Sequence, residues 1–364
     1  MRALKNILVT GGAGFIGCNF IRFVLEKTGG FTGRIVNLDA LTYAGNRMSL
    51  ADIEAKQGAN ARYFFEHGDI CDRAFVEGLF AKYAIDTVVH FAAESHVDRS
   101  IVGPEAFVKT NVMGTFTLLD VARNAWKDGA GALREDVLFH HISTDEVYGS
   151  LGETGYFTET TPYDPRSPYS ASKAGSDHLA AAYSHTYGLP VTVSNCSNNY
   201  GPYQFPEKLI PLMILNMLEG KPLPVYGDGK NIRDWLYVED HNSAVWTIMR
   251  GGKAGETYNI GGENEWENIK LLNVLIDIVA AKAKRDPAKI RDTVAFVKDR
   301  PGHDRRYAID CSKIKRELGW KQAVSFEEGL ARTVDWYLAN PQWIESIRSG
   351  EYQRWVEKNY GERG

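Results

Sequence analysis

The chain has 364 residues, of which 44% are hydrophobic and 24% charged, the proportions of an ordinary globular protein. Its formal net charge of -4 argues against a nucleic-acid surface, and no run of about 18 apolar residues predicts a membrane-spanning helix. The four cysteines, Cys18, Cys71, Cys196 and Cys311, form no CxxC pair, so we expect no disulfide framework. No apolar leader precedes the first predicted strand, and we expect a cytoplasmic protein.

The first half of the chain alternates short apolar runs with helical patterns. Such alternation implies right-handed βαβ units and therefore a Rossmann-type, doubly wound parallel sheet of the α/β class. The expected strands are residues 6–10, 34–39, 62–66, 86–91, 137–143 and 191–196, and the two clearest helices are residues 105–126 and 168–187.

The pattern changes after about residue 197, where proline and glycine become frequent. Short strands mix with helices there, which predicts a smaller, mixed α/β lobe. We therefore expect a Rossmann domain over residues 1–197 and a substrate-binding lobe over most of residues 198–364. The boundary is soft, because part of residues 230–262 is expected to return to the first domain.

A glycine-rich turn directly follows the first predicted strand. Its sequence, TGGAGFIG, places Gly11, Gly14 and Gly17 in GxxGxxG spacing at the start of a predicted helix. Glycine lets the backbone approach a pyrophosphate closely, and the helix N-terminus presents free N–H donors to it. A turn without a ligand is the alternative, but the strand–turn–helix context favours a dinucleotide site.

Asp39 ends the second predicted strand. A carboxylate there can accept hydrogen bonds from a ribose 2′-hydroxyl and would repel a 2′-phosphate. No arginine follows it in DALTY, so NAD is favoured over NADP, although Asp39 could instead be a turn residue. Residues after the later strands could also border the cofactor. The residues expected to bind it are Gly11, Gly14, Phe15, Ile16, Gly17, Asp39, Leu41, Thr42, Asp69, Ile70, Phe91, Ala92, Ala93, Ser95 and Thr110, with Tyr169 and Lys173.

Tyr169 and Lys173 form a YxxxK pattern in a predicted helix that begins with Pro168, and residues i and i+4 share one helix face. A free tyrosine, with a pKa of about 10, is a poor base at neutral pH. A nearby ammonium and an oxidised nicotinamide would favour its phenolate. A lone YxxxK is more often a solvated helix face, but here Thr144 precedes it at a strand end and a dinucleotide loop precedes both.

Two adjacent carboxylates, Asp145 and Glu146, follow Thr144. Such a pair is costly to desolvate, but two carboxyl groups in opposite protonation states can serve as an acid and a base. Consecutive strand residues point to opposite faces, so both groups can reach one substrate only if the strand has ended before them. Glu146 could also be a structural carboxylate.

Together these motifs resemble the extended short-chain dehydrogenase/reductase family over almost the whole chain. The resemblance narrows to one branch, the dTDP-glucose 4,6-dehydratases, in the blocks ISTDEVYG, SPYSASKAGSDHL, CSNNYGPYQFPEKLIPL, PLPVYGDGKNIRDWLYVEDH and DRPGHDRRYAID. It implies a lyase that oxidises C4 of the sugar with NAD, eliminates water across C5 and C6, and reduces C6. It also assigns Asp145 as the acid, Glu146 as the base, Tyr169 as the base for the 4-hydroxyl, and Thr144 and Lys173 as its supports.

The same resemblance implies residues that line the nucleotide sugar, dTDP-glucose. Arg233 and the arginines of RPGHDRR offer forked donors for a diphosphate, although loop structure and surface charge are the alternative. His96 and His303 lack metal-type spacing, so we expect no metal. The implied substrate-binding set is Ser95, Thr144, Asn198, Glu207, Lys208, Leu209, Pro224, Tyr226, Arg233, Asn268, Arg300 and His303.

The apolar stripe of residues 105–126 is more often intramolecular core. In the family, however, this helix and the Tyr169 helix also form a dimer interface, so we expect a homodimer.

Three other functions remain open. A related NAD-dependent sugar-nucleotide dehydratase would use the same motifs, but a GDP-mannose dehydratase tends to lack the residue at Asp145 and to prefer NADP. A 4-epimerase would have no use for Asp145 and Glu146. A non-catalytic dinucleotide-sensing protein would usually have lost Tyr169 or Lys173.

Overall fold

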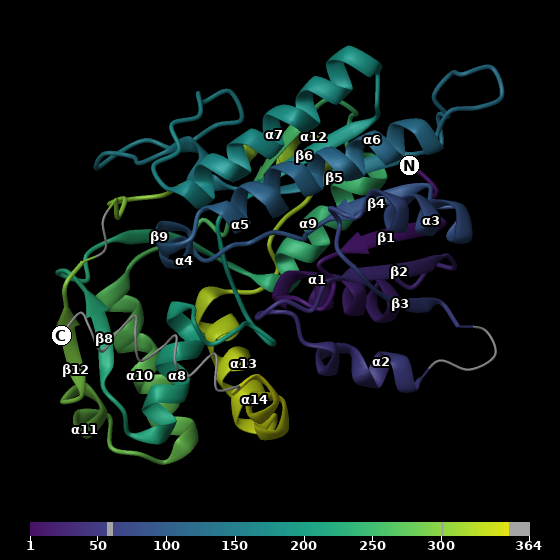
Figure 1. Ribbon diagram of the computed structural model, residues 1–364. Coiled ribbons are helices and arrows are strands. Elements are labelled where there is room, and N and C mark those ends of the chain that lie inside the picture. The colour runs from purple at the N-terminus through teal and green to yellow at the C-terminus, as the bar shows by residue number, and fades with distance from the viewer. Residues whose placement is uncertain (57–60, 300–301, 349–364) are drawn as a thin grey trace.

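The computed structural model describes residues 1–56, 61–299 and 302–348 (Figure 1). Its centre is a seven-stranded parallel sheet in the order β10-β6-β5-β4-β1-β2-β3. The Rossmann-type prediction is confirmed, and the ends of the six expected strands differ by at most one residue from those observed. The strands are β1 (Asn6–Thr10), β2 (Arg34–Asp39), β3 (Tyr63–His67), β4 (Thr87–His90), β5 (Leu138–Thr144), β6 (Val191–Cys196) and β10 (Thr257–Ile260).

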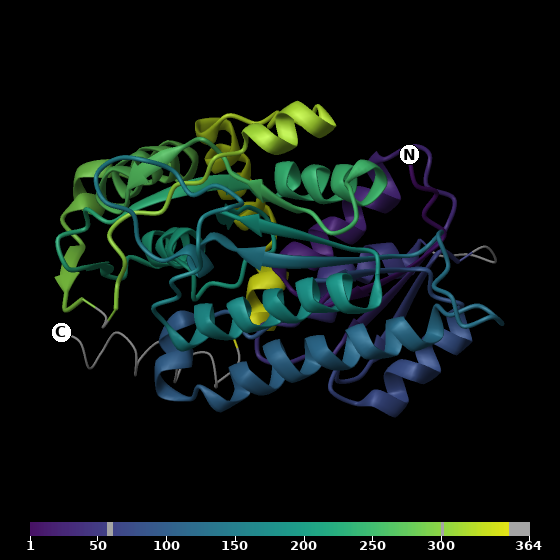
Figure 2. The same ribbon diagram turned by 90° about the horizontal axis from the view of Figure 1, so that it is seen from above.

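Helices cover both faces of this sheet, and α6 and α7 lie side by side on one of them (Figure 2). Along β1, Ile7 and Val9 belong to one buried apolar cluster and Leu8 to another, so both faces are core. The face of Leu8 carries α3 (Arg73–Tyr83), α6 (Thr115–Ala125) and α7 (Pro168–Tyr187). The face of Ile7 and Val9 carries α1 (Phe15–Arg22), η1 (Phe23–Lys27), α9 (Val238–Gly251) and α12 (Ser312–Leu318).

Local signals determine where α7 begins and ends. The Ser167 hydroxyl accepts a hydrogen bond from the Ser170 N–H, and the Ser170 hydroxyl accepts one from the Ser167 N–H, which completes a capping box. Pro168 occupies the first turn, and Gly188, with φ of 67°, ends the helix. The helix that carries Tyr169 therefore starts at a well-defined position.

The predicted helix over residues 105–126 is interrupted. It consists of α5 (Glu105–Phe107), a π-helical segment η3 (Val108–Gly114) and α6. In η3 the buried Asn111 amide bonds both backbone groups of Glu94 and the Ser172 hydroxyl. A π-turn of this kind is common beside functional sites, and a 3.6-residue period cannot predict it.

The chain after residue 197 builds a smaller lobe around its own apolar cluster, seen on the left in Figure 1. β10 and α9 lie apart from it, on the large sheet. The lobe contains β7 (Asn198–Tyr200), β9 (Ile232–Tyr237) and β11 (Glu265–Glu267) in one sheet, β8 (Leu223–Tyr226) and β12 (Val294–Val297) in another, and α8 (Leu209–Glu219), α10 (Asn268–Ala283), α11 (Pro287–Arg291), α13 (Phe326–Ala339) and α14 (Pro341–Ile347).

Four short segments lie after β2, β4 and β5, at the carboxyl ends of these strands. They are η2 (Arg47–Leu50), α2 (Ala51–Ala55), α4 (Val97–Val102) and η4 (Asp145–Tyr148). In the parts of the chain that the structure describes, no helix has the length and apolar character needed to cross a membrane.

Candidate active site

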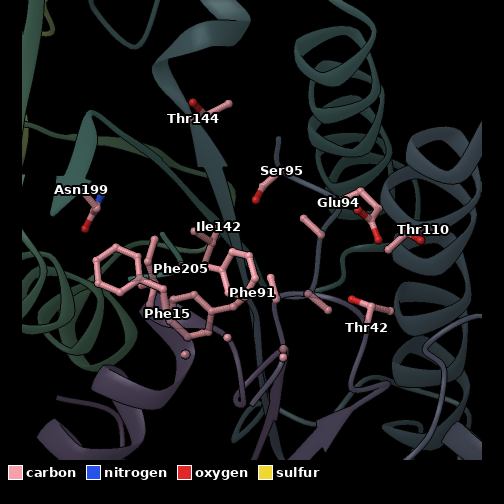
Figure 3. Close-up of a pocket in the computed structure, with 18 of the residues that line it drawn as sticks. Phe15, Thr42, Phe91, Glu94, Ser95, Thr110, Ile142, Thr144, Asn199 and Phe205 are labelled. Atoms are coloured by element: carbon pink, nitrogen blue, oxygen red, sulfur yellow. The ribbon is translucent and has the colours of Figure 1, made fainter. Parts of the chain in front are cut away.

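A cavity of about 340 Å³ lies at the carboxyl ends of β1, β2, β4 and β5, where the smaller lobe meets the large sheet. Figure 3 shows the rings of Phe15, Phe91 and Phe205 gathered together, with Glu94 and Thr110 on the opposite side. Most predicted site residues line this cavity: Gly11, Gly14, Phe15, Ile16, Gly17, Asp39, Thr42, Asp69, Ile70, Phe91, Ala92, Ala93, Ser95, Thr110, Thr144, Asp145, Glu146, Tyr169, Lys173, Asn198, Glu207 and Lys208.

The glycine-rich turn is packed so closely that side chains are excluded from it. Gly11 has φ of 70°, and a Cβ there would lie 2.7 Å from the backbone of Ala92. A Cβ on Gly17 would lie 2.3 Å from the Gly11 carbonyl oxygen. Gly14 precedes α1 without a side-chain cap. The helix N-terminus therefore presents backbone donors to the cavity, which fits a pyrophosphate.

The carboxylate of Asp39 ties the glycine-rich turn to the loop after β2. Its Oδ2 accepts the Ala13 N–H and its Oδ1 accepts the Leu41 N–H, each at 2.8 Å. Burial raises its pKa, and the two N–H donors oppose that shift. Each oxygen keeps a further lone pair for a ribose hydroxyl. Leu41, predicted to bind the cofactor, does not line the cavity.

β5 ends at Thr144, which is the last residue to pair with β6. Asp145 begins the 3-10 turn η4, and the Thr144 hydroxyl accepts the Glu146 N–H at 3.3 Å. Because Asp145 and Glu146 lie beyond the strand, they escape its alternation between faces. Both therefore line the same cavity, as joint action on one substrate requires.

Asp145 lies in an environment that favours its protonated form. Its side chain is 2% exposed, and its Oδ2 has no hydrogen-bond partner among the described residues. Burial raises its pKa well above the usual range, and the charges of Glu146 and Asp234 add to the shift, while Arg233 opposes it. A buried carboxyl group of this kind can donate a proton near neutral pH.

Tyr169 and Lys173 lie on the face of α7 that borders the cavity. Burial raises the pKa of Tyr169 well above its usual value of about 10, and Glu146 adds to the shift, whereas the Thr144 hydroxyl opposes it. The Lys173 ammonium donates to the Ile142 carbonyl oxygen at 2.7 Å, and burial lowers its pKa. Tyr169 therefore needs positive charge beside its ring before it can act as a base at neutral pH.

Two residues predicted to bind substrate link the lobes. The Glu207 carboxylate accepts hydrogen bonds from the Tyr43 hydroxyl at 2.9 Å and from Arg99 Nε at 3.2 Å. Lys208 Nζ donates to the Ser95 carbonyl oxygen at 2.9 Å. These contacts hold the loop before α8 against the loops after β2 and β4.

The other predicted substrate residues lie beyond the cavity lining. Arg233 is buried on β9, where it donates to the Asp304 carbonyl oxygen at 2.9 Å and lies over the Tyr307 ring. His303 Nδ1 lies 2.6 Å from Asp299 Oδ1. Arg300 lies outside the described residues. The predicted residues outside the lining are Leu209, Pro224, Tyr226, Arg233, Asn268 and His303.

Sequence reasoning missed several lining residues. Ala40, Gly68 and Ser197 each follow a strand directly, so the strand-end rule could have found them. Gln204 and Phe205 lie in an irregular loop of the second lobe, for which no periodic signal exists. The other missed residues are Leu38, Ala44, Gly45, Glu94, Ile142, Ser143, Cys196 and Asn199.

The described residues form neither a metal-binding cluster nor a disulfide. Within the described ranges, no group of three or more His, Cys, Asp or Glu side chains could hold a metal ion. The four cysteines are free thiols. The side chains that line the cavity supply carboxyl, phenol, hydroxyl, ammonium, amide and thiol groups.

Comparisons with known proteins agree with this site. A family model described as GDP-mannose 4,6 dehydratase matches residues 8–333. The dTDP-glucose 4,6-dehydratase of Shigella flexneri is 55% identical, over 98% of this chain and 99% of that protein. The structure of DesIV, a dTDP-glucose 4,6-dehydratase from Streptomyces venezuelae with NAD bound, is 47% identical with a TM-score of 0.85, over 94% of this chain and 100% of that one. A UDP-glucose 4-epimerase of Thermotoga maritima is 30% identical with a TM-score of 0.79, over 93% and 100%. The chain therefore belongs to the dTDP-glucose 4,6-dehydratase family.

Proposed function

We propose that this protein is an NAD-dependent hydro-lyase that converts dTDP-glucose to dTDP-4-keto-6-deoxyglucose. One observation carries the proposal: Asp145 and Glu146 follow the end of β5 and line the same cavity as Tyr169 and Lys173. An enzyme that only oxidises and re-reduces C4 needs the tyrosine and the lysine. The added pair of carboxyl groups is what an elimination requires.

The first domain fits NAD. The open N-terminus of α1 would take the pyrophosphate, and Asp39 would take the ribose hydroxyls. When bound, NAD supplies the acceptor for the C4 hydride and later its donor to C6. We assign this cofactor to residues 1–197 and the nucleotide sugar mainly to residues 198–364.

Oxidation at C4 requires removal of the 4-hydroxyl proton, which we assign to Tyr169. The Thr144 hydroxyl lowers the pKa of Tyr169, and we assign it a hydrogen bond to the same substrate oxygen. Lys173, four residues further along α7, adds positive charge and holds the nicotinamide ribose. These groups offset the effect of burial, so the phenol can reach the basicity that proton transfer needs.

Elimination follows because a 4-ketone makes the C5 proton acidic. We assign Glu146 to remove that proton and Asp145 to protonate the departing 6-hydroxyl. The raised pKa of Asp145 supports its role as the acid, because burial favours the neutral carboxyl group. The sequence alone left this division of roles open.

We also propose that the enzyme is a cytoplasmic homodimer. Four large apolar side chains on and around α4 and η3, namely Ile101, Val102, Val108 and Met113, are exposed. They lie beside the helices that pair across the family's dimer interface, and a second copy would cover them. The four free thiols suit a reducing compartment.

The test is the fate of hydrogen at C5. The purified protein is incubated with dTDP-glucose in deuterated water without added NAD, and the product is analysed by NMR and mass spectrometry. We expect a 4-keto-6-deoxy sugar with deuterium at C5 and no net NADH. An epimerised hexose that keeps its 6-hydroxyl would reject the dehydratase assignment.

A variant isolates the elimination step. Glu146→Gln should keep the fold, oxidise C4 and block the loss of water, so that NADH accumulates at 340 nm. The matched control is Glu153→Gln, which changes an exposed glutamate outside the cavity and should turn over normally. Undiminished water loss in Glu146→Gln would remove Glu146 from the mechanism.

A further inference from the structure

We infer that Asp177 is a positioning residue that supplies the counter-charge of Lys173 and keeps it an ammonium beside Tyr169. The inference rests on the proposed roles of Tyr169 and Lys173. Asp177 lies one turn beyond Lys173 on the same face of α7, so about 5–6 Å separate their Cβ atoms. Their side chains are 4% and 5% exposed, so water screens the pair little.

The Asp177 carboxylate is held by three donors. His141 Nε2 lies 2.9 Å from Oδ1, while the hydroxyls of Ser143 and Tyr163 donate to Oδ2 at 2.6 and 3.0 Å. Asp177 does not line the cavity, so it cannot touch the substrate there. A buried carboxylate with this many fixed donors is positioned, and its effect must pass through its neighbours.

His141 does not neutralise this carboxylate. Because a carboxylate only accepts hydrogen bonds, the His141 proton must lie on Nε2. Its Nδ1 has no partner among the described residues, and burial together with the charge of Lys173 lowers the pKa of His141. The imidazole is therefore neutral near pH 7.

Further titratable groups near the pair are also uncharged near pH 7, among them Tyr163, whose pKa burial raises. From β4, burial lowers the pKa of His90 well below its usual range. From β6, burial raises the pKa of the Cys196 thiol to about 12, and from η4 it raises the pKa of Tyr148. Among these described neighbours, Lys173 is the cation that balances Asp177.

The pair has a consequence for catalysis. Burial lowers the pKa of Lys173 and Asp177 raises it, so the carboxylate extends the pH range in which the ammonium persists. The Ser143 hydroxyl, bonded to Asp177, belongs to the residue just before Thr144. One carboxylate thus acts electrostatically on the lysine and bonds the end of β5 on which Thr144 lies.

The first test is the pH dependence of C4 oxidation. NADH formation is followed at 340 nm in Glu146→Gln, where elimination is blocked, and in Glu146→Gln/Asp177→Asn. We expect the alkaline limb to move to lower pH by about one to three units in the double variant, because the lysine loses its proton earlier. Asp177→Glu should restore the limb. Tyr163→Phe keeps the Asp177 carboxylate and should leave the alkaline limb of the pH profile unchanged. A limb that does not move with Asp177→Asn would overturn the inference.

The second test needs no catalysis. Thermal unfolding at pH 7 is compared for Lys173→Met, Asp177→Asn and the double variant. Each single change leaves a buried charge alone, so the double variant should lose less stability than the two losses added together. If Asp177→Asn does not fold, the double variant should recover folding. Additive losses, or no recovery, would overturn the inference. A coupled pair in a protein without dehydratase activity would refute the proposed function alone.

Discussion

We predict that Asp145→Asn slows the loss of water from the substrate but stabilises the folded protein. The amide keeps the shape of the carboxyl group but cannot donate an acidic proton. A positioned general acid contributes roughly 10²–10⁴-fold, so the barrier to water loss should rise by about 2.7–5.5 kcal/mol. Oxidation of C4 does not use this proton, and NADH should therefore form and persist.

The same substitution should stabilise the fold at neutral pH. Burial raises the folded-state pKa of Asp145, so above the unfolded pKa of about 3.9 the folded protein must hold a proton that the unfolded chain has released, and this lowers its stability. The amide removes that penalty. We expect a higher Tm than the native protein at pH 7, and a gain that disappears as the pH falls below about 4.

Asp234→Asn is the matched control. Asp234 is equally buried, but it accepts the Gly262 and Asn264 N–H groups at 2.9 and 2.7 Å. An amide can satisfy one of these donors, and the loss of the other should cost about 1–3 kcal/mol. Tm is measured from pH 4 to pH 8, and products are followed by NMR. A lower Tm for Asp145→Asn at pH 7, or unimpaired water loss, would refute the reasoning.

Three further predictions concern the cofactor loop and assembly. Gly17→Ala places a methyl group 2.3 Å from a backbone oxygen, so it should cost about 1–3 kcal/mol and lower the NAD content of the purified protein. Gly78 has open space around it, so Gly78→Ala should keep both the stability and the NAD content of the protein. Equal losses of stability and NAD in the two variants would contradict this prediction. Asp39→Ala removes two backbone hydrogen bonds and should weaken NAD binding at least about tenfold, by titration calorimetry. Val108→Asp should give monomers in light scattering, whereas Phe296→Asp, also at an exposed apolar site, should remain dimeric.

The sheet could be predicted from the sequence because its strands are buried on both faces. An apolar run such as residues 7–9 then marks its strand with little ambiguity. The limits of α7 were predictable for another reason, since Pro168 and Gly188 occupy positions that favour those residue types. The π-helical segment η3 was missed because its register depends on Asn111 reaching Glu94 and Ser172.

The site residues also fall into two groups, those that the sequence could place and those that it could not. Residues at strand ends, such as Thr144, could be placed because the carboxyl ends of parallel strands meet at one edge. Phe205 could not, because its position depends on how the second lobe folds back. The proposed division of roles between Asp145 and Glu146 also draws on the structure, since the pKa of a carboxyl group depends on surroundings that lie far away in sequence.

The end of β5 leaves positions 145 and 146 outside the hydrogen-bonded ladder with β4 and β6. Mutations there leave every strand pairing intact, so natural selection can revise the reaction without revising the scaffold. The Thermotoga maritima epimerase has kept nearly the same backbone at 30% identity while catalysing a different conversion. Under the proposed function, the shared fold supplies the oxidation, and the two positions after the strand add the elimination without taking part in the hydrogen bonds of the sheet.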